Sequence, residues 1–191
     1  MPNYEVSASL ALSEEQRDAI AELLTSTHSE LNGIPSLFIS VKFLDTKWTY
    51  IGGKKVGVRA VGIAPSPDER QPMLTWTKTP TNVIMGHFRQ GSSRTEEQYA
   101  IMADRIVRGW NRIVGFNPDV DGFDSEKMLD SVLFLSTINA GVEQGYHLPP
   151  SGQDLQWFKD NVNSYKQKAD TGSWRFKRLV EELQAKGIVP N

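Results

Sequence analysis

The chain has 191 residues, a formal net charge of −2 at neutral pH, 39% hydrophobic residues and no cysteine. This composition is typical of a globular domain with a buried core, and the lack of cysteine excludes a disulfide framework, a thiolate metal site and a cysteine nucleophile. The balanced charge favours neither nucleic acid nor an anionic membrane as a partner. The start, Met1-Pro2, lacks the pattern of a secretory signal, and no apolar stretch approaches the ~20 residues of a membrane span, so we expect a cytoplasmic protein.

The first fifty residues read as a strand, a helix and a second strand. Residues 3–10 are strand-like, and Ser13 with Gln16 forms a capping-box pattern at the start of a helix with regularly spaced apolar residues. Gly33 is a helix stop, and residues 37–43 are rich in strand formers. A helical crossover of this length favours parallel pairing of the two strands.

An insertion at 46–80 separates this unit from the rest of the chain. Residues 48–51 and 56–63 flank Gly52-Gly53 and predict a hairpin, while the proline-rich segment 64–80 reads as a loop.

The strand–helix–strand pattern then repeats. Residues 82–89 predict a strand, and Thr95 with Gln98 opens a second amphipathic helix that ends at Gly115. The run 132–135 is apolar throughout and predicts a fully buried strand. The chain therefore contains two β-α-β units, which places it in the α/β (α+β) class.

The character of the chain changes after Pro150. Segments 153–168 and 173–187 predict helices with apolar contact residues. We expect a domain at 1–150 and a helical carboxy-terminal extension at 151–191.

Pro2 is the first candidate for chemistry. Removal of the initiator methionine would leave a secondary amine, and an α-amino group titrates at about 7.7–8.0 when unperturbed. Burial or nearby cations would lower that pKa and yield a usable general base.

Four further residues are candidates. His28 shares the apolar face of the first helix, and it is either a donor to a substrate oxygen or a hydrogen-bonded histidine of the core. Arg89 ends a strand and Arg94 precedes a helix, so they form either a carboxylate cradle or a pair of solvated surface arginines. Glu143 follows the last strand, where it either orients water or is an ordinary loop glutamate.

No metal or cofactor signature is found. Residues 117–122 mimic the start of a calcium loop, but Met128 stands where a bidentate glutamate is required. Phosphate-loop, dinucleotide-binding and nucleophile-elbow patterns are also missing.

Several of these pieces resemble, in order and spacing, the tautomerase superfamily, in particular the branch of cis-chloroacrylate dehalogenase and its fungal relatives. The resemblance covers roughly residues 2–160 and is carried by Pro2-Asn3-Tyr4, residues 24–28 followed by Leu31 and Gly33, residues 94–98, Glu143-Gln144-Gly145 and Trp157-Phe158.

The resemblance implies a mainly parallel four-stranded sheet with helices on one face, assembly as a homotrimer and no cofactor. It implies that Pro2 is the catalytic acid or base and that His28, Arg89 and Arg94 hold the carboxylate or carbonyl oxygens of a small-molecule substrate. Glu143 would orient water, as in the hydrolytic members.

Two departures from the dehalogenase branch stand out. That branch separates its two arginines by two residues, whereas four residues lie between Arg89 and Arg94. It also has a tyrosine in the strand before the glutamate, where this chain has only Val132-Leu133-Phe134-Leu135. Tyr146 and His147 are possible replacement polar groups.

The expected activity is a tautomerase-type isomerisation, in which Pro2 moves a proton on a small keto, enol or unsaturated carboxylic acid. One alternative is a hydratase, dehalogenase-like lyase or cyclase on the same scaffold. A second is a non-catalytic small-molecule binding or assembly protein.

Overall fold

A computed structural model describes residues 2–44, 49–51, 54–56, 81–89, 95–122 and 125–190. Within the insertion, β3 (Thr49–Ile51) and β4 (Lys54–Val56) pair antiparallel, as expected of the hairpin. The rest of the predicted hairpin and the proline-rich loop lie outside the described residues.

Four strands form the main sheet, in the order β2-β1-β5-β6. They are β1 (Asn3–Ser7), β2 (Ser40–Leu44), β5 (Asn82–Arg89) and β6 (Leu129–Ile138). β1 pairs parallel with β2 and β5 pairs parallel with β6, whereas β1 and β5 are antiparallel. This arrangement confirms two β-α-β units in a mainly parallel four-stranded sheet.

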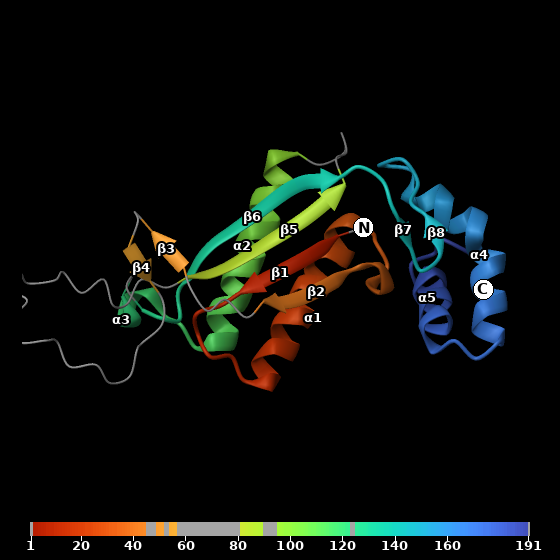
Figure 1. Ribbon diagram of the computed structural model, residues 1–191. Coiled ribbons are helices and arrows are strands. Elements are labelled where there is room, and N and C mark those ends of the chain that lie inside the picture. Colours follow the sequence, from red (N-terminus) through yellow and green to blue (C-terminus); the bar gives the residue numbers. More distant parts are fainter. Residues whose placement is uncertain are drawn as a thin grey trace, which may run out of the picture.

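Two long helices, α1 (Glu14–Asn32) and α2 (Glu96–Val114), cover one face of this sheet (Figure 1). Each begins with the predicted capping box, at Ser13 and Thr95, and each ends at a glycine in the left-handed conformation. Those glycines, Gly33 and Gly115, have φ of 69° and 66°, which a residue without Cβ adopts at little cost. Both helix boundaries are therefore local properties of the sequence.

The carboxy-terminal part of the chain forms a hairpin and two helices. The hairpin consists of β7 (Val142–Glu143) and β8 (Tyr146–His147), and the helices are α4 (Asp154–Asp170) and α5 (Trp174–Ala185). The helical extension is thus confirmed, and Figure 1 shows it beside the end of the sheet where β5 and β6 terminate. No helix among the described residues is long and apolar enough to cross a membrane.

The segment predicted as a strand at 37–43 divides into two elements. Ser36–Phe38 forms a short 3-10 helix, and β2 begins only at Ser40. The cause is tertiary, because this turn brings Phe38 to full burial against the rings of Trp157 and Phe158, at centroid distances of 5.6 and 5.4 Å.

The prediction that 132–135 is a fully buried strand is wrong. β6 spans ten residues, and Leu133 in its middle is 48% exposed. The described helices α1 and α2 cover only one face of the sheet, so alternate residues of β6 point to the other face. A run of apolar residues cannot by itself distinguish one covered face from two.

Candidate functional site

Strand directions bring three of the predicted site residues to one end of the sheet. Because β1 runs antiparallel to β5, its first residues lie beside the last residues of β5, and β6 ends there as well. Pro2 directly precedes β1, Arg89 ends β5, and the segment after β6 leads to Glu143. Figure 1 shows the amino terminus, the tips of β5 and β6, and β7 close to this end.

Pro2 is held in place rather than frayed. Its side chain is buried, and its carbonyl oxygen accepts a hydrogen bond of 3.2 Å from the backbone N–H of Ser40. Asn3 pairs with His87, so continuing the antiparallel register by one residue places Pro2 opposite Phe88. The chain therefore enters β1 in a defined position next to the strand that ends in Arg89.

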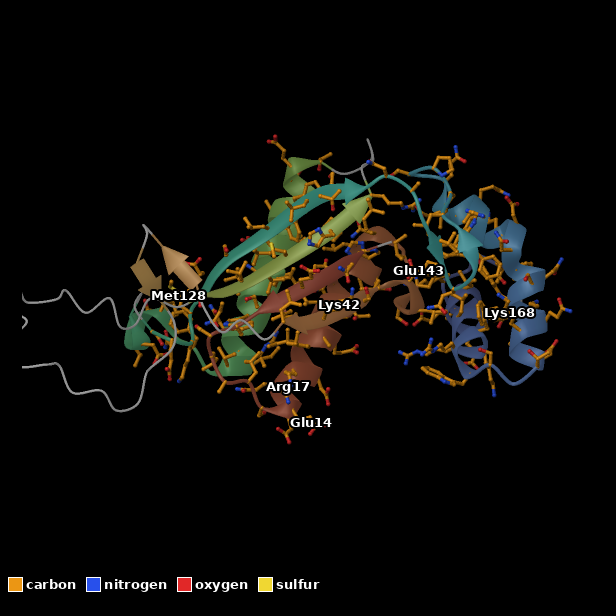
Figure 2. All side chains as sticks on the ribbon, in the orientation of Figure 1. Glu14, Arg17, Lys42, Met128, Glu143 and Lys168 are labelled. Carbon is orange, nitrogen blue, oxygen red and sulfur yellow. The ribbon has the colours of Figure 1, made fainter. Side chains whose placement is uncertain are left out.

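Glu143 lies on a tight hairpin and not in the open loop that the sequence suggested. The turn residues Gln144 and Gly145 have φ of 52° and 86°, the pair of positive values that a two-residue hairpin turn requires. Figure 2 shows Glu143 between the end of the sheet and the carboxy-terminal helices.

The surroundings of Glu143 change its acidity. Burial raises the pKa of Glu143 to about 7, while the positive charges of the amino terminus and of Arg89 act in the opposite direction. These two charges act on Glu143 only because they lie near it, so the electrostatics agree with the convergence seen in the strand directions. A carboxyl group with this pKa can donate or accept a proton near neutral pH.

Arg89 is engaged by the carboxy-terminal extension. Its guanidinium forms an ion pair with the carboxylate of Asp154, the first residue of α4, and donates a hydrogen bond to the carbonyl oxygen of Pro149. Asp154 was not predicted as a functional residue, because an acidic residue in the first turn of a helix is common. No sequence signal linked it to Arg89.

A pocket of about 290 Å³ opens beside this ion pair. Its lining is mixed, with apolar side chains from the end of α1 and the start of α4 alongside polar groups. The described lining residues are Leu31, Asn32, Ile34, Arg89, Gln98, Ser151, Gly152, Asp154 and Leu155.

His28 is placed in the core. It is fully buried, its Nδ1 lies 2.9 Å from the hydroxyl oxygen of Tyr4, and its ring packs against Phe88 at 4.9 Å. Like Pro2 and Glu143, it is not among the described residues that line the pocket beside Arg89. This burial and this bond are those of a hydrogen-bonded core histidine, one of the two alternatives for His28, and its role as a donor to a substrate oxygen stays a prediction.

Three candidates remain: Arg94, Tyr146 and His147. Arg94 lies outside the described residues. Tyr146 donates or accepts a hydrogen bond of 2.7 Å with Ser164 of α4, and the ammonium group of Lys168 lies 4.1 Å from the centre of its ring. Tyr146 thus anchors the hairpin that carries Glu143, and His147 is exposed.

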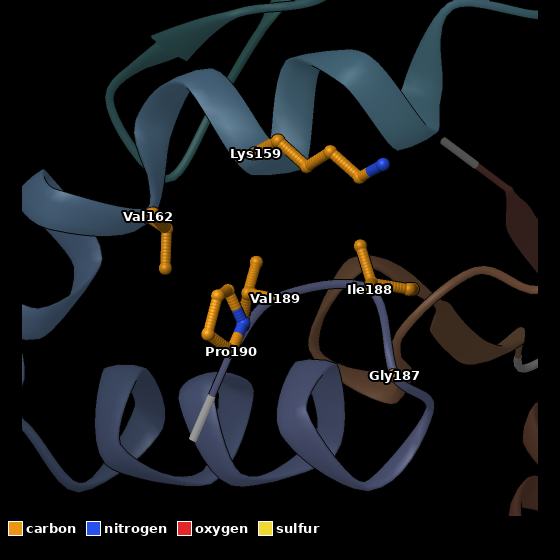
Figure 3. A pocket seen from close by; sticks show the side chains of 6 residues that line it. All are labelled: Lys159, Val162, Gly187, Ile188, Val189 and Pro190. Atoms are coloured by element: carbon orange, nitrogen blue, oxygen red, sulfur yellow. The ribbon is translucent and has the colours of Figure 1, made fainter.

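A larger pocket lies within the extension, away from these residues. It measures about 530 Å³ between α4 and residues 187–190 (Figure 3), and Lys159 is its only charged lining residue among those described. In the described part of the chain, no three His, Asp or Glu side chains are grouped to hold a metal ion. The turn that mimics a calcium loop forms a short helix, α3 (Pro118–Asp121), capped by Asn117.

Comparison with solved structures identifies the fold. The crystal structure of N1, a member of the cis-3-chloroacrylic acid dehalogenase family, matches with a TM-score of 0.55 and 21% identity, over 88% of this chain and 99% of that one. MIF2 of Leishmania major matches with a TM-score of 0.50 and 14% identity, over 78% of this chain and 97% of that one. No protein-family model and no curated protein matches the sequence. The likeness is one of fold, which this chain shares with these two structures.

Proposed function

We propose that this chain, which has the tautomerase-superfamily fold, is a cofactor-independent isomerase. Pro2, freed by removal of Met1, would move a proton between carbon and oxygen of a small keto, enol or unsaturated carboxylic acid. Arg89 would stabilise the oxygen on which negative charge develops, and Arg94 is a second candidate for this role. His28, which lies in the core, would fix the positions of Tyr4, through the hydrogen bond to its hydroxyl, and of Phe88, through ring packing.

The observation that carries the proposal is the convergence of Pro2, Arg89 and Glu143 at one end of the sheet. Pro2 is buried at the start of β1, and the positive charges of Arg89 and of the amino group of Met1, the residue bonded to Pro2, both act on Glu143. Once Met1 is removed, the secondary amine of Pro2 and a carboxyl group with a pKa of about 7 would form a pair suited to proton transfer at neutral pH.

A second candidate function is addition of water to an unsaturated acid. It is favoured by the partial burial and raised pKa of Glu143, since a carboxylate of this basicity can take a proton from water. The two functions differ in what they require of Glu143. Hydration needs its carboxylate to take a proton from water, whereas tautomerisation needs it only as the proton-transfer partner of Pro2.

The first measurement is the intact mass of the protein as expressed. A mass lacking methionine supports the proposal, because only then is the proline amine free. Retained methionine would acylate that amine and contradict the acid–base role of Pro2.

The second measurement is turnover of an arylpyruvate enol, followed by its ultraviolet absorbance. We expect Pro2→Ala to lower kcat/KM by about a hundredfold or more, the usual contribution of a general acid or base. Asn3→Ala is the matched control, since its side chain only bonds the hydroxyl of Ser40 at an exposed position. Equal turnover by the wild type and Pro2→Ala would contradict the acid–base role of Pro2, and no turnover by the wild type would favour a non-catalytic binding protein.

Glu143→Gln separates the two candidate functions. Retained enol turnover in this variant, together with wild-type hydration that the variant loses, would assign water activation to Glu143. Loss of enol turnover would instead place Glu143 in the tautomerase step.

We also propose that the protein assembles as a homotrimer. The face of the sheet that α1 and α2 leave open carries half-buried side chains, among them Glu5, Met85 and His87, and Leu133 is exposed there. Light scattering after size-exclusion chromatography tests the assembly, and a monomer at micromolar concentration would contradict it.

A further inference from the structure

The ion pair between Arg89 and Asp154 determines the charge that the pocket offers to a ligand. The side chains of the two residues are 7% and 16% exposed, and both line the pocket of about 290 Å³. The other described lining residues, which include Asn32, Gln98 and Ser151, are uncharged. Among the described residues of the lining, one positive and one negative charge therefore cancel.

A carboxylate arriving at Arg89 would meet two obstacles. If it displaced Asp154, it would break a largely buried ion pair, and Asp154 would lose its partner. If it bound beside Asp154, two negative charges would lie close together in a site of low polarity. Glu143, which lies near Arg89, adds a further partial negative charge near neutral pH.

An uncharged carbonyl oxygen meets neither obstacle. It accepts a hydrogen bond from a guanidinium or an amide N–H without requiring a second positive charge. Such donor groups in the pocket lining are the guanidinium of Arg89 and the amides of Asn32 and Gln98. The Asn32 amide also donates a hydrogen bond of 3.2 Å to the carbonyl oxygen of His28, and Arg89 also bonds Asp154 and Pro149. The apolar side chains of Leu31, Ile34 and Leu155 can cover the carbon skeleton next to it.

We propose that Asp154 is a specificity-determining residue, which makes the pocket beside Arg89 bind an uncharged carbonyl group (ketone, amide or ester) in preference to a carboxylate. The proposal rests on the proposed function only in taking this pocket as the substrate site. It refines that function, because it makes an uncharged carbonyl, and not a carboxylate, the group that Arg89 holds.

Direct binding tests the proposal without any need for turnover. The probes are 2-oxobutanoate and 2-oxobutanamide, which are similar in size and differ in charge, titrated against the full chain by ligand-observed NMR. We expect the wild type to bind the amide more tightly. In Asp154→Asn the positive charge of Arg89 is no longer neutralised, so binding of the acid should strengthen by about tenfold and reverse the preference.

Two further variants show whether charge or structure is responsible. Asp154→Glu keeps the negative charge and should keep the preference for the amide. Asp160→Asn is the matched control, because Asp160 lies exposed on the same helix and only accepts a hydrogen bond of 2.7 Å from Gln156. Its Kd values should equal those of the wild type, and circular dichroism should show all variants folded.

The proposal is overturned if the wild type prefers the acid or binds neither probe at millimolar concentration. It is also overturned if Asp154→Asn leaves the ratio of the two Kd values unchanged, or if Asp154→Glu loses the preference. Neither binding measurement depends on turnover. A failure of the isomerase proposal therefore shows itself in turnover alone, and a failure of the specificity proposal in binding alone.

Discussion

Glu143 and Arg89 lie near each other, but only the charge of Arg89 is balanced by an ion pair in the described structure. Glu143 is partly buried and forms no ion pair within the described part of the chain, and this burial raises its pKa to about 7. Arg89 is more deeply buried, and Asp154 and the carbonyl of Pro149 stabilise its charge. The positive charge is thus neutralised by the extension, whereas the acidic group keeps a proton that it can exchange near neutral pH.

Replacement of Glu143 by glutamine should stabilise the protein in a pH-dependent way. The pKa of Glu143 is higher in the folded state than its ordinary value of 4.5, so the free energy of unfolding of the wild type falls as the pH rises from about 4.5 to about 7. Glutamine has no ionised form and avoids this loss. We expect Glu143→Gln to have a melting temperature a few degrees above that of the wild type at about pH 8.5 and no advantage at about pH 4.

Differential scanning fluorimetry across this pH range measures the effect. A difference in melting temperature that is the same at both ends of the range would show that Glu143 titrates normally.

The hydroxyl of Tyr4 stabilises the core through His28. Both side chains are fully buried, and the bond between them measures 2.9 Å. Tyr4→Phe removes one partner and leaves the ring in place, so we expect the free energy of unfolding to fall by about 1–3 kcal/mol. Urea unfolding measures the change, with Tyr99→Phe as the control because no hydrogen bond of its hydroxyl is found in the described structure. Equal losses in the two variants would contradict the role given to this bond.

At the scale of elements, β5 supports the site through close packing in the middle of the sheet. Gly86 faces the aromatic ring of Phe88, which stacks with Tyr99 and Phe134 and contacts Tyr4 edge-on. A Cβ atom at Gly86 would lie 2.6 Å from the Phe88 ring and 3.0 Å from the Tyr4 ring. Glycine at this position allows both rings to pack against the strand that ends in Arg89.

Gly86→Ala should therefore destabilise the protein, by about 1–3 kcal/mol, because the surrounding rings are buried and cannot move aside. Gly141→Ala is the matched control, since a Cβ there would meet only Leu148 at 3.5 Å, an ordinary contact. Urea unfolding of both variants checks the prediction, and a Gly86→Ala protein as stable as Gly141→Ala would refute it.

At the scale of the whole molecule, the carboxy-terminal extension is part of the core. Phe158, Tyr165, Phe176 and Leu179 belong to the same buried cluster as the side chains between sheet and helices. The carboxylate of Glu182 in α5 accepts hydrogen bonds from the backbone N–H and the hydroxyl of Ser36. The division of the chain at residue 150 remains a prediction, but these contacts join the two parts.

Phe38→Ala tests this continuity. Phe38 is fully buried between the sheet and the rings of Trp157 and Phe158, so its loss should lower the free energy of unfolding by about 3–5 kcal/mol. Unfolding should remain a single transition, at the same urea concentration by tryptophan fluorescence and by far-ultraviolet circular dichroism. Val120→Ala, at a position 79% exposed, should change little. Two separated transitions would indicate that the extension unfolds independently.

The sequence alone determined the features that depend on neighbours a few residues apart. The capping boxes at Ser13 and Thr95 and the glycine stops at Gly33 and Gly115 are local hydrogen-bonding patterns, so both long helices were predicted with their ends. The repeated β-α-β order followed from them. The convergence of Pro2 and Arg89 depends instead on the antiparallel pairing of β1 with β5, which joins the two units only in the folded chain.

Only the tertiary structure decided which partners these residues meet. Asp154 lies 65 positions from Arg89 in the sequence. An acidic residue in the first turn of a helix is common, so only the folded structure, in which Asp154 meets Arg89, reveals this ion pair. Tertiary packing also explains why Phe38 lies in a 3-10 helix and not in the predicted strand. It buries His28 in the core and leaves one face of β6 uncovered. Local hydrogen bonding is encoded within a few residues, whereas burial and charge pairing depend on segments that meet only when the chain has folded.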